Sequence, residues 1–219
     1  HAVRVIVEYC RGSHSPFIHV VPSKETSRDK FAAERVVENS VFLGHTRVIL
    51  RSDNEPALLV LIGDALKGLR IQQLDSVASE GSVPHDPQTA RAAEVAVRNL
   101  KCQGRAMHLT LARFLERHVP VTHPLIAWLV EYAAFVRMTG VIGRDCKSAY
   151  AGIRGTEHSL RLPFFGERVR FNGRSREGGV AGENIRWSEG IYVGVHRRTN
   201  QYLVFDSERG IREARTVMR

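Results

Sequence analysis

The chain has 219 residues, and 43% of them are hydrophobic, so it can bury the core of one medium domain with a small second one. Its 32 Lys and Arg residues outnumber 23 Asp and Glu residues, giving a net charge of +9. That balance favours a polyanionic partner such as nucleic acid over an acidic small molecule, although the charge could also serve solubility alone.

The three cysteines are far apart and form no C-x-x-C pair, which argues against a disulfide framework and against a zinc ribbon. The most apolar stretch, residues 125–138, is too short to cross a bilayer and contains Glu131 and Arg137. The N-terminus lacks a signal-peptide pattern. We therefore expect a soluble intracellular protein without a membrane partner, and the start at His1 is expected for a piece of a longer polyprotein.

The first third of the chain has the pattern of an α/β domain. Residues 2–7 and 17–21 are rich in β-branched or aromatic side chains and predict a hairpin. Thr26 and Asp29 are spaced for a capping box, which predicts a helix that ends at Gly44.

A second strand and helix follow. Residues 47–51 predict a strand, and Pro56 stands at the first turn of a helix with one apolar stripe. The order strand, strand, helix, strand, helix favours a mixed sheet covered by helices. Residues 72–88 are polar and rich in turn formers, so we predict a loop there.

The longest predicted helix covers about residues 90–118 and has two distinct faces. Apolar residues at alternating steps of three and four predict a buried stripe at Ala93, Val97, Leu100, Gly104, Met107, Leu111 and Leu115. Another face carries a carboxylate followed by cations: Glu94, Arg98, Lys101 and Arg105. That row is suited to successive phosphates, but an ordinary solvent face with a Glu94–Arg98 pair gives the same spacing.

The last part of the chain predicts a scaffold helix and a small β-domain. Pro124 opens an apolar helix that contains Trp128, and residues 143–164 resemble a linker with a short helix at 148–153. Short strands are predicted at residues 168–171, 191–195, 202–206 and 214–218, which favours a small β-barrel. Its arginines predict either a second nucleic-acid contact or simply a soluble basic barrel: Arg168, Arg170, Arg174, Arg176, Arg186, Arg197 and Arg198.

Two carboxylates have the setting expected of metal ligands. Asp53 follows the predicted strand at residues 47–51, and Glu94 lies near the start of the long helix. Carboxylates from a strand end and a helix start can share a divalent ion, because Mg²⁺ prefers oxygen ligands and substrate phosphates. This set of groups is suited to cutting and joining phosphodiester bonds.

Several blocks of the sequence resemble the retroviral-type integrases, and specifically the integrase region of copia-like retrotransposon polyproteins. Residues 48–56, which read VILRSDNEP, resemble the family's S-D-[NQ]-x-P block. Residues 17–24, FIHVVPSK, resemble its second-to-third strand segment, and residues 80–94 resemble the approach to its catalytic Glu. Residues 165–167 and 187–194 resemble the entry and a strand of its SH3-like tail. The order and spacing of the blocks carry the resemblance.

The resemblance implies a ribonuclease-H-like mixed sheet with flanking helices at residues 1–142, a linker at 143–164 and an SH3-like β-barrel at 165–219. It implies a homo-oligomer that acts in the nucleus on DNA, both element ends and target. Its catalytic and metal ligands would be Glu8, Asp53 and Glu94, holding Mg²⁺ or Mn²⁺ for 3′-end processing and strand transfer. The DNA-binding residues would be Arg91, Arg98, Lys101 and Arg105.

One implied ligand departs from the family. Glu8 stands where the family has an Asp, and its oxygens lie one methylene further from the backbone, which we expect to weaken catalysis at a Mg²⁺ site. Two other readings therefore stay open. The protein is a catalytically inactive nucleic-acid-binding remnant or domesticated module, or it is an assembly module that self-associates through the Trp128 helix.

Overall fold

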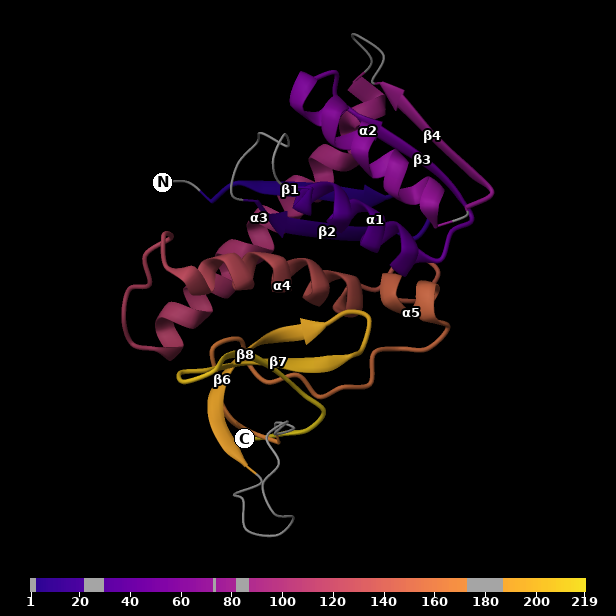
Figure 1. Cartoon of the computed structure of the whole chain (residues 1–219). Coiled ribbons are helices and arrows are strands. Elements are labelled where there is room, and N and C mark those ends of the chain that lie inside the picture. Colours follow the sequence, from indigo (N-terminus) through magenta and orange to yellow (C-terminus); the bar gives the residue numbers. More distant parts are fainter. Residues whose placement is uncertain (1–2, 22–29, 73, 82–86, 173–186) are drawn as a thin grey trace. The chain divides into compact units, whose positions relative to one another are not determined.

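The computed structural model describes residues 3–21, 30–72, 74–81, 87–172 and 187–219, and of residues 87–90 only the backbone. These residues form a mixed α/β protein with helices and small sheets (Figure 1). The chain divides into two compact units. The N-terminal unit comprises His1–Gln103 and Ala133–His158, and the C-terminal unit comprises Gly104–Tyr132 and Ser159–Arg219. The boundaries expected at residues 142 and 164 remain a prediction.

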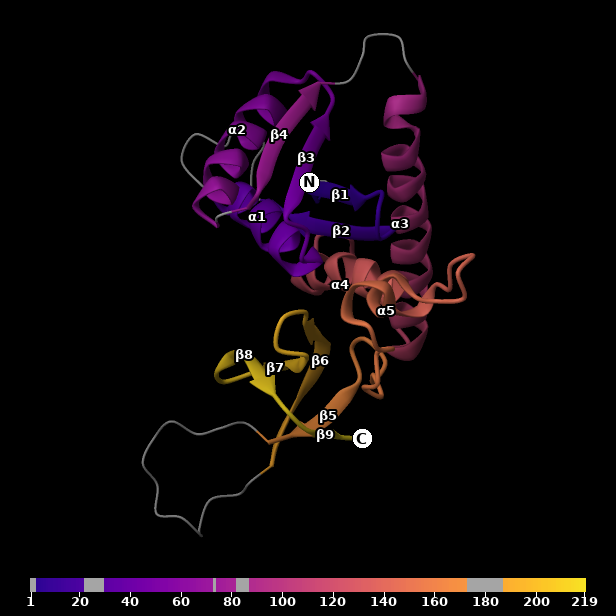
Figure 2. The same ribbon diagram turned by 90° about the vertical axis from the view of Figure 1, so that its right-hand side faces the viewer.

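The N-terminal unit begins with the predicted hairpin. Strand β1 (Val5–Cys10) pairs antiparallel with β2 (Ser15–Val20), and Val21 extends the pairing by donating its N–H to the carbonyl of Arg4 at 3.0 Å. Four successive β2 side chains from Pro16 to His19 are buried, so this strand is covered on both faces. The connecting turn is directed toward helix α3 (Pro87–Phe114), as Figure 2 shows.

Two helices pack against this hairpin and against each other. Helix α1 (Phe31–Leu43) ends at Gly44, which has a φ of 70°, as glycine allows. Helix α2 (Pro56–Ile71) starts at its proline, as predicted. A shared core joins them through Val21, Ala32, Ala33, Val36, Leu61 and Ala65. The capping-box residues Thr26 and Asp29 lie outside the described residues.

A second two-stranded sheet corrects the prediction of a loop at residues 72–88. Strand β3 (Arg47–Ser52) pairs in parallel with β4 (Ser76–Gly81), which runs through that segment. The sequence SVASEG does not predict a strand, because its valine is the one residue with high β-propensity and the pairing depends on backbone hydrogen bonds. In the described residues the two strand pairs form separate sheets, so the single mixed sheet we expected is not seen there.

The remaining helices lie where they are predicted, but the long helix begins three residues and ends four residues before the expected bounds. Helix α3 covers Pro87–Phe114, α4 covers Pro124–Gly140, and α5 covers Ala149–Arg154. Ser148 caps α5 by accepting the Ala151 N–H at 3.0 Å. The predicted stripe on α3 is only partly correct, since Leu100 and Leu111 are buried whereas Ala93 and Leu115 are exposed. Within the described residues, no helix combines the length and the apolar character needed to span a bilayer.

The C-terminal unit contains one five-stranded sheet. Its strands are β5 (Arg168–Phe171), β6 (Ser188–His196), β7 (Gln201–Asp206), β8 (Gly210–Ala214) and β9 (Val217–Met218), in the order β8-β7-β6-β5-β9. All pairs are antiparallel. The described residues do not pair β8 with β9, so closure into a barrel is not confirmed. Arg174, Arg176 and Arg186 lie outside the described residues.

Aromatic side chains form the core of the C-terminal unit. Tyr132 stacks on Phe165 with ring centroids 5.8 Å apart and meets Tyr192 edge to face at 5.6 Å. The Tyr192 hydroxyl donates to the Tyr132 hydroxyl at 3.1 Å. Burial raises the pKa of Tyr132 to about 12 and raises that of Tyr192 as well, so both phenols stay neutral in this core.

Candidate nucleic-acid interface

The first expected metal ligand, Glu8, is bound into a hydrogen-bond network of the protein. Glu8 lies on β1, half-buried, and its Oε1 accepts a hydrogen bond from Nδ2 of Asn39 at 2.9 Å. The same Nδ2 lies 2.9 Å from Nε2 of His19 on β2. An amide nitrogen has two hydrogens, so Asn39 can donate to both, which makes Nε2 the unprotonated nitrogen of His19. Because Asn39 is buried, this network holds Glu8 against α1.

Asp53 lies where the sequence predicts it, directly after β3, and its side chain is exposed. The chain then turns through Asn54 and Glu55 into α2. The neighbouring Ser52 hydroxyl is buried and makes no hydrogen bond in the described residues. At the end of β3 the Asp53 carboxylate is therefore exposed to solvent, and the adjacent Ser52 hydroxyl is buried without a hydrogen-bond partner in the described residues.

Glu94 is exposed on α3, and the three carboxylates do not form a ready metal site. Among the described residues, no group of three or more His, Cys, Asp or Glu side chains is arranged to hold a metal ion. The donor set that the resemblance implies is therefore present in the sequence but is not gathered in this structure. Binding of Mg²⁺ or Mn²⁺ by Glu8, Asp53 and Glu94 stays a prediction, and no catalytic step is derived from it.

The expected DNA-binding residues are exposed on α3. Arg91, Arg98 and Lys101 lie on the part of the helix that belongs to the N-terminal unit, and Arg105 lies on the part that belongs to the C-terminal unit. Within the described part of the chain, Arg98 forms no ion pair with Glu94. The ion pair of that alternative is therefore not seen in the described residues, whereas the exposure of the row fits both an ordinary solvent face and a ligand-binding face.

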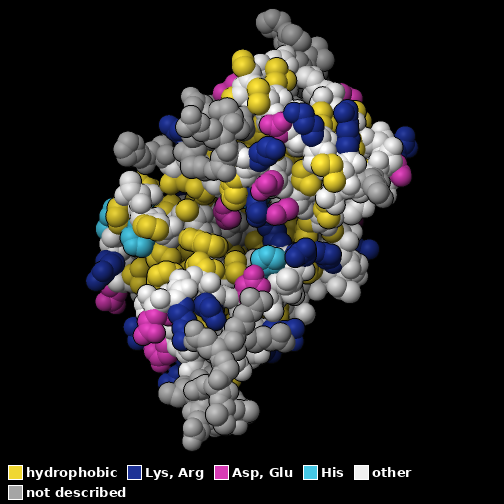
Figure 3. Space-filling model, in the orientation of Figure 1, with side chains coloured by type: hydrophobic (Ala, Val, Ile, Leu, Met, Phe, Trp, Pro, Cys, Tyr) yellow, Lys and Arg dark blue, Asp and Glu magenta, His cyan; other side chains and the backbone are white. Residues whose placement is uncertain are grey.

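Charges of both signs are mixed over the visible surface. On the face in Figure 3, Lys and Arg side chains alternate with Asp, Glu and hydrophobic patches. A net charge of +9 therefore does not by itself identify a binding face. A local cluster of cations is a better indicator of a face that binds an anionic ligand.

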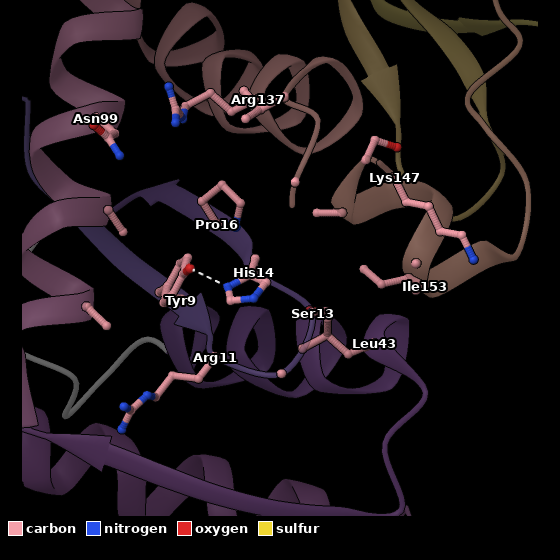
Figure 4. Close-up of a pocket in the computed structure, with 18 of the residues that line it drawn as sticks. Tyr9, Arg11, Ser13, His14, Pro16, Leu43, Asn99, Arg137, Lys147 and Ile153 are labelled. Carbon is pink, nitrogen blue, oxygen red and sulfur yellow. Dashed lines mark hydrogen bonds between the residues drawn. The ribbon is translucent and has the colours of Figure 1, made fainter. Parts of the chain in front are cut away.

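One such cluster surrounds a pocket of about 1010 Å³ in the N-terminal unit. The β1–β2 turn, the end of α1, α3, the end of α4, and α5 with the segment leading into it form its walls (Figure 4). Among the described residues, four cations line it, Arg11, Arg91, Arg137 and Lys147, against one carboxylate, Asp145. Apart from Arg91, sequence reasoning missed these residues, because they come from four separate segments and share no local spacing.

Arg91 connects the pocket with the α3 row. At about 100° per residue, residues 91, 92, 95, 96 and 99 face one side of a helix, and residues 94, 98 and 101 face another. The first set lines the pocket, and Arg91 lies at the border between the two faces.

Comparisons with known proteins give structural likenesses only. No protein-family model matches the sequence, and no curated protein matches it. The catalytic core domain of BIV integrase aligns with a TM-score of 0.44 and 16% identity, over 68% of this chain and 84% of that chain. A chain of the simian T-cell lymphotropic virus intasome in complex with PP2A regulatory subunit B56 gamma aligns with a TM-score of 0.47 and 12% identity, over 99% and 72%. Both scores are below 0.5, and nothing about this chain is inferred from them.

Proposed function

We propose that the protein is an integrase-like DNA-binding protein that contacts the DNA backbone through the exposed cations of α3. The observation that carries the proposal is the availability of Arg98 and Lys101, which are exposed, on one helix face, and without an ion pair in the described residues. The order of the sequence blocks that resemble integrases supports the integrase-like part of this proposal.

Such a row would bind DNA without reading its sequence. Lys and Arg on successive turns of a helix match phosphates along a strand, and neutralising phosphates releases condensed counterions. Phosphate contacts position a protein on DNA but do not distinguish bases. We therefore expect affinity that falls steeply with salt and varies little with DNA sequence.

The test is the salt dependence of duplex DNA binding by the variant Arg98→Gln/Lys101→Gln. The plot of log affinity against log salt has a negative slope, and each lost phosphate contact reduces the magnitude of that slope by about 0.9. We therefore expect the double variant to reduce it by about 1.8. The matched control is Arg47→Gln/Arg70→Gln, which removes the same charge from exposed sites in the N-terminal unit. Equal slopes for the two variants would show that binding depends on net charge and not on the row.

DNA strand transfer in a copia-like element is the finer proposal, with Glu8, Asp53 and Glu94 as the expected carboxylates. It is supported by the SDNEP block and by the position of Asp53, exposed at the end of β3. It also requires the carboxylates to come together, because the described residues do not group them. Nicking or joining of DNA ends that depends on Mg²⁺ or Mn²⁺ and disappears in Asp53→Asn would support it. Activity that survives Asp53→Asn would exclude this assignment.

A further inference from the structure

The pocket in the N-terminal unit has an excess of positive charge that its own carboxylate does not balance. Of the described residues that line it, four are cations, Arg11, Arg91, Arg137 and Lys147, and one is a carboxylate, Asp145. Asp145 is also engaged in its own loop, since its Oδ1 accepts the backbone N–H of Lys147 at 3.3 Å. A concave site with several cations and few anions attracts an anionic ligand.

The cations stand on well-anchored backbone. The loop that carries Lys147 is closed by Gly143, whose N–H donates to the Lys147 carbonyl at 2.8 Å, and by a bridge between Ile142 and Ser148. Next to it, the Ser148 hydroxyl donates to Glu157 at 2.7 Å. Arg137 is half-buried near the end of α4. The ammonium and guanidinium groups are therefore attached to fixed segments, which lowers the entropy lost on binding.

An aromatic pair occupies the middle of the pocket. The Tyr9 hydroxyl lies 2.9 Å from Nδ1 of His14, and the two ring centroids are 6.4 Å apart. In Figure 4 this pair lies below Arg137, whose side chain reaches toward Asn99, and the side chains of Arg11 and Lys147 lie on opposite sides of the pair and extend away from it. His14 has a φ of 56°, an unusual backbone conformation that sets its ring beside Tyr9.

This arrangement suits a nucleotide better than a simple anion. A volume of about 1010 Å³ far exceeds one phosphate group. The cations that line the pocket match phosphates, and an aromatic ring in the same pocket matches a base, since bases stack on aromatic side chains without regard to sequence. The rings of Tyr9 and His14 are tilted by 46° to each other. An acidic peptide could meet the cations but would make no use of the rings.

We propose that the pocket formed by the β1–β2 turn, α3, α4 and the segment before α5 binds a nucleotide unit, with phosphates at Arg137 and Lys147 and the base against Tyr9 and His14. The unit can come from a nucleic-acid strand or from a free nucleotide. The proposal stands apart from the α3 row, because it uses a different face of that helix and different cations.

Calorimetric titration with a 5′-phosphorylated dinucleotide tests it. Its two phosphates can also contact neighbouring cations of the α3 row, so Arg98→Gln/Lys101→Gln serves as a second control that should bind it like the unchanged protein. We expect Arg137→Gln/Lys147→Gln to weaken binding about tenfold or more, because hydrogen bonds to charged groups are lost. The control Arg47→Gln/Arg70→Gln should bind like the unchanged protein. Equal weakening in both variants, or no binding by the unchanged protein, would overturn the proposal.

Ligand and ring variants complete the test. Pyrophosphate should bind at least about tenfold more weakly than the dinucleotide, because base stacking is lost. Tyr9→Leu should weaken binding of the dinucleotide but not of pyrophosphate. Tyr9→Phe, which keeps an aromatic ring, should bind the dinucleotide nearly as tightly as the unchanged protein. Pyrophosphate or an oligoglutamate peptide that binds as tightly as the dinucleotide would overturn the nucleotide assignment. If a nucleoside monophosphate binds as tightly as the dinucleotide, the ligand is a free nucleotide. If it binds more weakly, the ligand is a unit of a nucleic-acid strand. If Tyr9→Leu does not fold, the cation variant and the ligand series still decide.

Discussion

The acidic and the basic residues of the N-terminal unit are organised in opposite ways. The three expected carboxylates are dispersed: Glu8 is held by Asn39, and Asp53 and Glu94 are exposed without forming a metal-binding group in the described residues. The cations, by contrast, lie along one face of α3 or line one pocket. The described residues thus bring cations together, whereas binding of a metal ion by the three carboxylates remains a prediction.

The largest expected effect comes from removing both sets of cations. If the row and the pocket act independently on DNA that has a single-stranded end, their losses multiply. Combining Arg98→Gln/Lys101→Gln with Arg137→Gln/Lys147→Gln should then weaken binding of such DNA about a hundredfold. Fluorescence anisotropy with a labelled oligonucleotide measures this. A combined variant no weaker than the row variant alone would show that the pocket does not contact the strand.

Asn39 should matter more to folding than to DNA binding. Asn39→Ala leaves the Glu8 carboxylate without one of its donors and opens a buried site, so we expect the free energy of unfolding to fall by about 1–3 kcal/mol. Chemical denaturation checks this, with Asn172→Ala on the exposed surface as the control. A stability equal to that of the control would mean that the network does not hold Glu8 in solution.

Glu8→Gln should have a smaller effect. Glutamine keeps an amide oxygen that can accept from Asn39, so we expect the free energy of unfolding to change by less than about 1 kcal/mol. DNA affinity should stay unchanged, because Glu8 lines neither the pocket nor the α3 row. A loss of stability larger than that of Asn39→Ala would show that the negative charge, and not the hydrogen bond, is what the fold uses.

Local signals in the sequence predicted local structure well. Gly44, Pro56 and Ser148 mark helix boundaries that the structure confirms, because caps and prolines act within a few residues. Strand β4 was missed because its partner β3 determines it and its side chains are mostly exposed. The expected barrel depended on closure of a sheet, which no local pattern encodes.

The candidate site was predicted unevenly for the same reason. Exposure of Arg98 and Lys101 followed from helical spacing alone. The bond between Asn39 and Glu8 joins residues 31 positions apart, and the pocket joins the β1–β2 turn to the segment before α5. Such contacts arise only when the chain folds, so spacing along the sequence could not reveal them.

The roles of the cations and of the three carboxylates are tested most directly by asking whether DNA binding requires a divalent metal. Affinity for a duplex would be measured by anisotropy in EDTA and in Mg²⁺ at matched ionic strength, for the unchanged protein and for Asp53→Asn. We predict that Mg²⁺ does not strengthen binding and that Asp53→Asn binds DNA like the unchanged protein in each condition, because the cations and not the carboxylates hold the phosphates. Binding that appears only with Mg²⁺ and is lost in Asp53→Asn would contradict the account and show that the three carboxylates assemble into a working metal site.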